Sequence, residues 1–228
     1  MNKKIFAFTL SEVLITLGII GVVAALTIPN VVKNYQKKQT IVMLRRAYTN
    51  LQTAIRMSVA ENGDIANWDL IGTNTNDYPT PAQKEEFVQK YFLPYFKTAK
   101  FYTNNNGLWR YKLINGVNKG FWVPAILCND GSLYSFTMQN NYIWIIMDIN
   151  GSKGPNKMGR DIFVAGIYFN ELKKYNTIRF WGAKDSILNK TTDNYGCNKQ
   201  SNDQNYAGFF CGAWIERNNW EIPDDYPW

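Results

Sequence analysis

The clearest hydrophobic pattern in the chain is one nearly unbroken apolar run close to its start. Residues 8–29 read FTLSEVLITLGIIGVVAALTIP, and Glu12 is the only charged residue between Lys4 and Lys33. About twenty apolar residues in a row are enough to cross a bilayer as a helix. A carboxylate at the edge of such a segment is costly in lipid and indicates a partner group. The pattern predicts a membrane-spanning helix over residues 8–32.

After this run the apolar positions change to the spacing of an amphipathic helix. They fall three and four residues apart, at Ile41, Leu44, Tyr48, Leu51 and Ile55. No acidic residue occurs from Lys33 to Ala60, and Asn62-Gly63 is a typical helix end. We therefore expect one continuous helix over residues 8–63 with a basic strip, which is either a solvated face or a contact with acidic surfaces or lipid. The strip consists of Lys33, Lys37, Lys38, Arg45, Arg46 and Arg56.

The remaining residues, 64–228, carry the signals of a separate globular head. Thr80-Pro81 followed by Gln83 predicts a capped helix that ends near Leu93-Pro94. Short runs rich in branched and aromatic residues predict strands, and Asn129-Asp130-Gly131 and residues 139–141 predict hairpin turns. The expected strands are Leu108–Ile114, Phe121–Leu127, Ser132–Met138, Tyr142–Ile149, Ile162–Phe169 and Thr177–Trp181. The fold class is α+β, with the long N-terminal helix packed against an antiparallel sheet.

Composition excludes several kinds of active site. The chain has 228 residues and no histidine, which rules out mechanisms with a histidine base or histidine metal ligand. Cys128, Cys197 and Cys211 are too few and too widely spaced for a zinc site. The net charge of +7 is a weak argument for nucleic acid, so a nucleic-acid partner is not expected. We do not expect an enzyme, although acid pairs that converge only in the fold stay open.

Two interpretations compete for the N-terminus. A secretory signal peptide has a basic start, a shorter apolar run and small residues at its end, which Ala24 and Ala25 supply. The alternative is cleavage before the apolar run, between Ala7 and Phe8. Here the sequence resembles the signal of type IV prepilins and pseudopilins, in which a short basic leader precedes Phe and Thr-Leu-x-Glu. The matching residues are Ala7, in place of the usual glycine, then Phe8, Thr9, Leu10, Ser11 and Glu12, with Pro29 farther along.

The resemblance implies a processing and assembly scheme. Residues 1–7 would be a leader removed by a prepilin peptidase, and Phe8 would be N-methylated. Glu12 would pair with the amine of Phe8 in a neighbouring subunit, and the region around Pro29 would bend or melt on assembly. Independently of the resemblance, Pro29 has no N–H to donate, which predicts a kink in the helix. Partners would be further pilin or pseudopilin subunits, the membrane lipid and an inner-membrane assembly platform.

The same resemblance implies a structural role. The chain would be a subunit of a type II secretion pseudopilus or a type IV pilus. The alternative is a minor pilin whose head binds DNA, a surface glycan or secreted cargo. The subunit would cross the inner membrane once with its head outside the cytoplasm. The excess of Lys and Arg after the span, from Lys33 to Arg46, favours the opposite orientation by the positive-inside rule.

One segment between two expected strands suits a hard cation. It carries oxygen side chains at Asp148, Asn150, Ser152, Asn156 and Asp161, with interspersed glycines. It does not fit the EF-hand pattern, and it is similar to loops of some pseudopilins, a family with calcium-binding members. The alternative is a turn whose side chains cap the backbone. Ca²⁺ is thus the one cofactor considered, and three basic residues oppose it: Lys153, Lys157 and Arg160.

The cysteines allow one disulfide. Cys197 and Cys211 bracket a polar loop near the C-terminus, and pilins and related proteins often close such a loop with a disulfide. A bridge over about 15 residues contributes about 3 kcal/mol. Cys128 would then be a buried free thiol, but three cysteines allow three pairings, so either of the other two could instead pair with it.

Overall fold

The computed structural model describes residues 9–69, 79–139, 142–168, 177–182 and 195–228. The chain divides into two compact units, Met1–Gln39 and Thr40–Trp228. The first contains the N-terminal half of the long helix. The second contains the rest of that helix together with the sheet and the C-terminal segment. The fold class is α+β, as predicted.

The first element is α1, Leu10–Asn62, a single helix of 53 residues. Its described part agrees with the predicted helix, whose first residue, Phe8, lies outside the described residues. The helix continues through Pro29, which has no N–H to donate to the carbonyl of Ala25. It ends before Gly63, whose φ of 76° is the left-handed conformation that favours glycine at a helix end.

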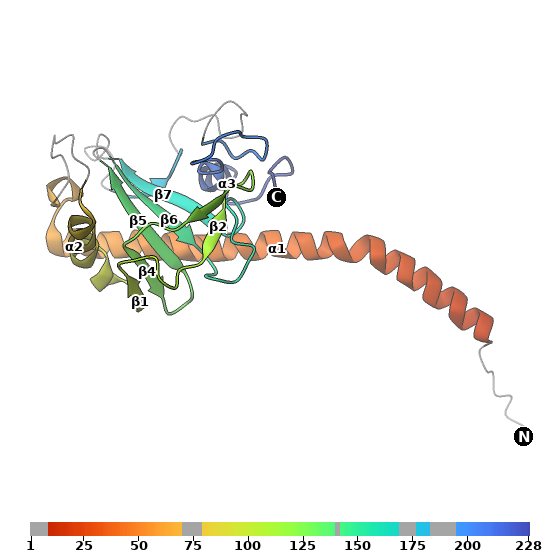
Figure 1. Ribbon diagram of the computed structural model, residues 1–228. Helices are drawn as coiled ribbons and strands as arrows, with labels where there is room; N and C mark the ends of the chain where they lie inside the picture. The colour runs from red at the N-terminus through yellow and green to blue at the C-terminus, as the bar shows by residue number, and fades with distance from the viewer. Residues whose placement is uncertain (1–8, 70–78, 140–141, 169–176, 183–194) are drawn as a thin grey trace, which may run out of the picture. The chain divides into compact units, whose positions relative to one another are not determined.

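The second half of α1 is the central helix of the larger unit. Its buried residues recur at helical spacing and form one face, as the apolar pattern predicted. The Tyr134 hydroxyl donates to the carbonyl of Ala47 at 2.9 Å, and the Tyr48 ring stacks on Phe180 at 4.2 Å. In Figure 1 this half of the helix runs along one face of the sheet. The buried set is Thr40, Leu44, Ala47, Tyr48, Leu51, Ala54, Ile55 and Ser58.

The sheet has six strands in the order β1-β4-β5-β6-β7-β8, with every neighbouring pair antiparallel. Strands β2 and β3 form a separate two-stranded ribbon. The strands are β1 (Thr98–Tyr102), β2 (Arg110–Lys112), β3 (Asn118–Gly120), β4 (Ala125–Cys128), β5 (Leu133–Gln139), β6 (Tyr142–Asp148), β7 (Ile162–Tyr168) and β8 (Arg179–Phe180).

The predicted strands match this sheet in its centre and differ at its edges. β5, β6 and β7 lie where the pattern placed them. The predicted turn Asn129-Asp130-Gly131 connects β4 and β5, with Gly131 at φ 87°. The turn at residues 140–141 lies outside the described residues. The sequence did not predict β1 or β3, because β1 is an edge strand with two exposed central residues and β3 is a short polar ribbon strand.

Two further helices occur in the described part of the larger unit. α2, Pro81–Tyr91, begins with the predicted cap: Thr80 and Gln83 exchange hydrogen bonds in a capping box. α3, Cys211–Arg217, was not predicted. Short 3₁₀ turns cover Ile65–Asn67 and Leu93–Tyr95.

The alternation along β6 assigns its residues to two faces of the sheet. Met147 is paired with Tyr134 and shares its face, which is the one covered by α1. Asp148 and Trp144 therefore point to the opposite face. There Trp144 contacts an aromatic group that includes Trp122, Trp181 and Phe209. The loop that follows β6, with its polar residues, starts from this second face.

Candidate functional site

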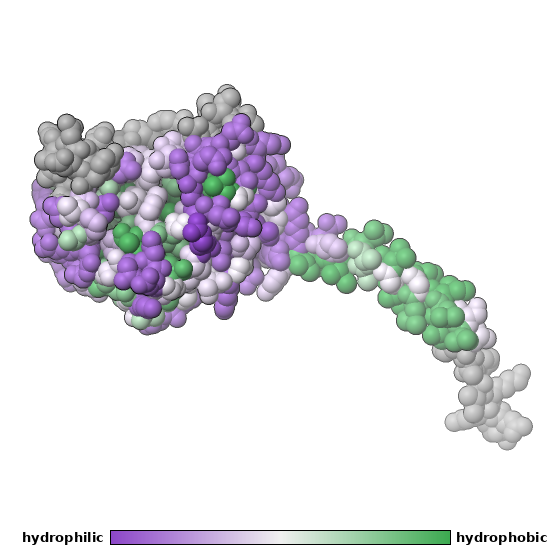
Figure 2. All heavy atoms as spheres, viewed as in Figure 1, coloured by the Kyte–Doolittle hydropathy of each residue, from purple (hydrophilic) through white to green (hydrophobic). Residues whose placement is uncertain are grey.

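The N-terminal half of α1 exposes apolar side chains around its whole circumference. Their relative solvent accessibility runs from 41% at Val13 to 78% at Leu10. Among the described residues, α1 is the helix long and apolar enough to cross a membrane, and none of its most apolar window is buried. Figure 2 displays this stretch as a continuous hydrophobic surface. The exposed set is Leu10, Val13, Leu14, Ile15, Leu17, Ile19, Ile20, Val22, Val23, Leu26, Ile28, Val31 and Val32.

A helix that is apolar on all sides requires lipid or other helices around it. Gly18 and Gly21 lie within this stretch, and a Cβ placed on either would meet nothing within 4 Å in the chain itself. Small residues of this kind allow the backbones of two membrane helices to approach closely. We call the stretch over residues 10–32 the apolar segment.

Glu12 caps the start of α1 in the single chain. Its Oε2 accepts hydrogen bonds from the backbone N–H of Thr9 at 2.8 Å and from the Thr9 hydroxyl at 2.7 Å. In return the backbone N–H of Glu12 donates to the Thr9 Oγ1 at 3.2 Å. This is a capping box, which the spacing Thr-x-x-Glu could have predicted and our sequence interpretation missed. Glu12 thus has a local partner as well as the predicted intersubunit one.

The structure describes only one of the other residues that we predicted to act in cleavage, methylation or assembly. Ala7 and Phe8, the predicted cleavage and methylation sites, lie outside the described residues. Pro29 lies within α1 at the end of the apolar segment, and the helix is uninterrupted there.

Asp148, the first residue of the predicted cation site, is fully buried and serves as an acceptor for N–H groups. Its Oδ1 accepts from the backbone of Asn150 at 3.1 Å and Gly151 at 2.8 Å, and its Oδ2 accepts from the Trp109 indole at 2.7 Å. Burial raises the pKa of this carboxyl to about 8, with a smaller contribution from the charge of Asp161, while the N–H donors act in the opposite direction. Trp109 was not predicted as part of the site.

Asp161 closes the same loop from its other end. Its Oδ2 accepts from the backbone N–H of Asn156 at 2.8 Å and from the Asn150 side chain at 3.4 Å, and its Oδ1 accepts from the backbone N–H of Lys157 at 2.6 Å. Burial raises the pKa of Asp161 as well, and these donors oppose the rise. Both carboxylates therefore cap the backbone of one loop. This is the alternative to a cation site that the sequence analysis left open.

This arrangement does not fit a calcium site. The carboxylate oxygens are directed at N–H donors, Ser152 is exposed, and Lys157 and Arg160 belong to the same turn. No group of three or more His, Cys, Asp or Glu residues that could hold a metal occurs in the described part of the chain. Two acceptor atoms in the loop, the side-chain oxygens of Asn150 and Asn156, are buried without a hydrogen-bond donor. Two neutral oxygens beside occupied carboxylates are a weak ligand set for Ca²⁺.

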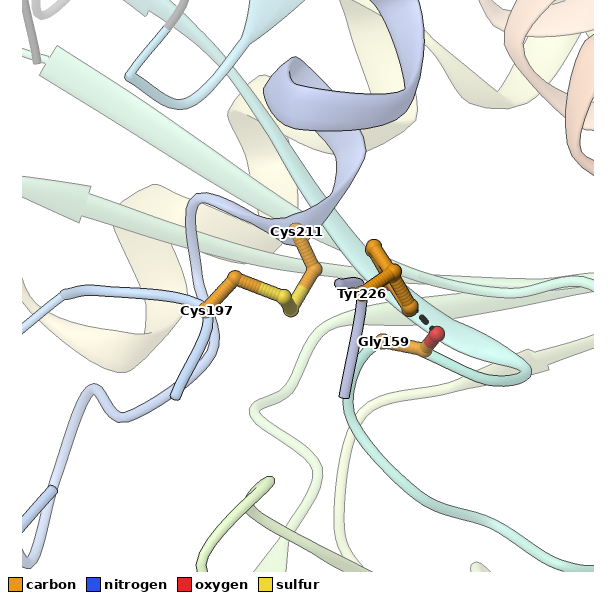
Figure 3. Close-up of a disulfide and its surroundings, with 4 residues drawn as sticks. All are labelled: Gly159, Cys197, Cys211 and Tyr226. Carbon is orange, nitrogen blue, oxygen red and sulfur yellow. Dashed lines mark hydrogen bonds between the residues drawn. A yellow bond between two sulfur atoms is a disulfide. The ribbon is translucent and has the colours of Figure 1, made fainter. Parts of the chain in front are cut away.

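The disulfide joins Cys197 to Cys211, at the start of α3. Figure 3 displays this bridge beside Tyr226, whose hydroxyl donates to the carbonyl of Gly159 at 2.6 Å. Gly159 has a φ of 80°, and a Cβ there would lie 2.8 Å from the Cys211 sulfur. Only glycine fits at this point, where the C-terminal segment, the disulfide and the loop before β7 meet. Cys128 is a buried free thiol, and burial raises its pKa to about 12.

Two arginines of the predicted basic strip contact other elements within the larger unit. Arg46 forms an ion pair with Asp130 at 3.4 Å, in the turn before β5. Arg45 donates to the carbonyl of Asn219 at 3.3 Å, and its guanidinium lies 5.3 Å from the Trp220 ring centroid. These two arginines thus stabilise the packing of the second half of α1 within the larger unit.

The larger unit also has an open groove of about 730 Å³. It lies between α1, the 3₁₀ turn before β1 and the turn after β4, with Met57, Phe96 and Asp130 among its lining residues. The lining is mainly apolar with a few polar groups. Its titratable lining residues are Tyr95, Lys97, Cys128 and Asp130.

Comparison with curated proteins and with solved structures gives no match for this chain. A family model described as "Family of unknown function (DUF6613)" matches residues 30–228. The match covers the second half of α1, the sheet and the C-terminal segment, and it begins directly after Pro29. Since it spans well over half of the sequence, the chain belongs to the DUF6613 family.

Proposed function

We propose that this protein is a pilin-like structural subunit that assembles into a filament through its N-terminal helix. A prepilin peptidase would remove residues 1–7, and the mature chain would begin at Phe8. The filament would be a type II secretion pseudopilus or a type IV pilus. The observation that carries the proposal is the apolar segment, which is exposed on every side of α1 and continuous with a helix built into a globular head.

The location follows from two features of the chain. A long apolar helix and a disulfide together indicate membrane anchoring or export from the cytoplasm. The disulfide joins residues of the larger unit, which supports a head outside the cytoplasm against the Lys and Arg bias. We propose a single-pass inner-membrane protein that awaits assembly, in which lipid first surrounds the apolar segment and other subunits later replace it.

Glu12 supplies the charge that the assembly scheme needs. It is the only acidic residue before Glu61. In lipid its carboxylate has few alternatives to pairing with a cation, and the mature N-terminal amine of a neighbouring Phe8 would be that cation. In the single subunit, Thr9 satisfies part of the carboxylate through the capping box, which keeps α1 intact until a neighbour arrives.

Two substitutions separate the charge of Glu12 from its capping role. Glu12→Gln keeps a residue that completes a capping box but removes the charge, whereas Glu12→Ala removes both. We expect both variants to insert in the membrane and neither to form filaments, as scored by electron microscopy of sheared cells and by membrane fractionation. Ser11→Ala is the matched control in the same turn and should assemble normally.

Normal filaments from Glu12→Gln would refute the pairing, because the cap alone would then suffice. Loss of membrane insertion in either variant would refute the stated separation of insertion from assembly.

A further inference from the structure

The residues directly after the apolar segment form a short, strongly basic stretch. Lys33, Lys37 and Lys38 lie within six residues, together with the exposed Tyr35. Lys33 and Lys38 are exposed and Lys37 is half-buried. We call residues 33–38 the basic segment. It lies wholly within the N-terminal unit, Met1–Gln39.

Charges of the opposite sign are missing near the basic segment in its own unit. Glu12 is the only acidic residue before Glu61, and it lies at the opposite end of the apolar segment. Arg45 and Arg46, by comparison, contact the Trp220 ring and Asp130 in the larger unit. The lysines therefore have no acidic partner within their own unit other than the distant Glu12.

The length of the apolar segment fixes the depth of these lysines in a membrane. At 1.5 Å per residue, residues 10–32 extend for about 35 Å, slightly more than the roughly 30 Å hydrocarbon core. The basic segment then covers about the next 8 Å, which is close to the thickness of one headgroup layer. Tyr35 has the amphipathic ring that is enriched at this level. Lys33, Lys37 and Lys38 would thus lie among the lipid phosphates.

We propose that the basic segment binds the headgroups of anionic phospholipids on the outer side of the membrane. The inference rests on the membrane-held stage of the proposed function, and it adds a lipid class to that stage. Three lysines on the outer side of the membrane are unusual, because Lys and Arg are normally in excess on the cytoplasmic side. Contact with anionic headgroups would explain their position. Assembly into a filament would break these contacts, so lipid charge would set how firmly the subunit is retained.

The test uses the full chain in nanodiscs that contain equal amounts of phosphatidylglycerol and phosphatidylcholine. After transfer to mild detergent, native mass spectrometry counts the lipids of each kind that stay bound. The test variant is Lys33→Gln/Lys37→Gln/Lys38→Gln. The matched control is Lys97→Gln/Lys100→Gln/Lys153→Gln, which makes the same charge change at exposed lysines of the larger unit.

We expect the wild type and the control to retain phosphatidylglycerol preferentially, and the test variant to lose that preference by about tenfold or more. Each lysine close to an anionic surface contributes about a fivefold effect, which salt reduces. An unchanged preference in the test variant, or an equal loss in the control, would overturn the proposal.

Filament formation by the same variants keeps the two proposals separable. If the wild type prefers phosphatidylglycerol and the preference depends on the three lysines, the lipid inference stands even where no filament forms. If the test variant keeps its lipid preference but no longer assembles, the lysines face a second subunit, and the lipid inference is overturned.

Discussion

The buried carboxyl of Asp148 makes the stability of the larger unit dependent on pH. Burial raises its pKa to about 8 in the folded state, far above the value of an unfolded aspartate, about 3.9. The folded state therefore keeps the proton to a higher pH than the unfolded state does. The stabilisation that comes from the protonated Asp148 carboxyl is fully present below about pH 4 and is lost as the pH rises towards 8.

The size of the effect follows from linkage. A single group that is protonated when folded and ionised when unfolded lowers the free energy of unfolding by up to about 1.4 kcal/mol for each pH unit. The window runs from the unfolded pKa to the folded one, and Asp161, whose pKa burial also raises, contributes with the same sign. The three N–H donors to Asp148 oppose the rise, so the measured slope reports the balance between burial and hydrogen bonding.

The measurement is urea unfolding of residues 40–228 at several pH values between 5 and 9, followed by tryptophan fluorescence. This fragment is the larger compact unit and keeps the buried face of α1. We expect the free energy of unfolding to fall between pH 5 and 8, and Asp148→Asn to flatten the fall while its amide oxygen still caps Asn150 and Gly151. Asp224→Asn, at an exposed site, is the control and should leave the slope unchanged.

A wild-type free energy of unfolding that does not fall over this range would refute the reasoning, because it would mean that the N–H donors hold Asp148 ionised. The same fragment tests the cation prediction. Addition of Ca²⁺ at each pH should leave the unfolding midpoint unchanged, and a clear increase would show that the loop binds the ion after all.

Three further predictions concern the larger unit. Replacement of both Cys197 and Cys211 by serine should lower the free energy of unfolding by about 3 kcal/mol, because the bridge closes a loop with a sequence separation of 14; an unchanged urea midpoint would contradict this. Cys128 should not react with a thiol reagent in the native fragment, because burial raises the pKa of its thiol to about 12. After denaturation the reagent should detect one thiol per chain, and fast labelling of the native fragment would contradict the prediction. Tyr134→Phe should cost about 1 kcal/mol by removing the hydrogen bond to Ala47, and Tyr102→Phe is the control for the loss of a hydroxyl from a strand tyrosine.

The elements with strong local signals could be predicted from the sequence. The amphipathic spacing along α1 and the glycine after Asn62 gave the helix end, and Thr80 with Gln83 gave the start of α2. The strands β5 to β7 carry long runs of branched and aromatic residues. β1 and α3 could not be predicted, since their conformations depend on neighbours: β1 forms by pairing with β4, and α3 starts at a cysteine held by the disulfide.

The sequence predicted where the polar loop after β6 lies but not what its carboxylates bind. The polar residues after β6 form one loop, as expected, but the positions of backbone N–H groups decide whether a carboxylate is available to a cation. Such positions depend on the fold of the loop and cannot be deduced from residue types. The Trp109 contact is of the same kind, because it joins residues 39 positions apart. The capping role of Glu12, in contrast, was visible in the sequence as Thr-x-x-Glu.

The central claim is that the apolar segment is an assembly helix released by cleavage in front of it. Its most direct test is the N-terminal residue of the mature protein, isolated from membranes of cells that express the full chain and a prepilin peptidase. Tandem mass spectrometry of the N-terminal peptide should identify Phe8 as the first residue, with a methyl group on its amine. A mature chain that keeps Met1, or one that begins beyond Ala25 after the loss of the apolar segment, would contradict the account.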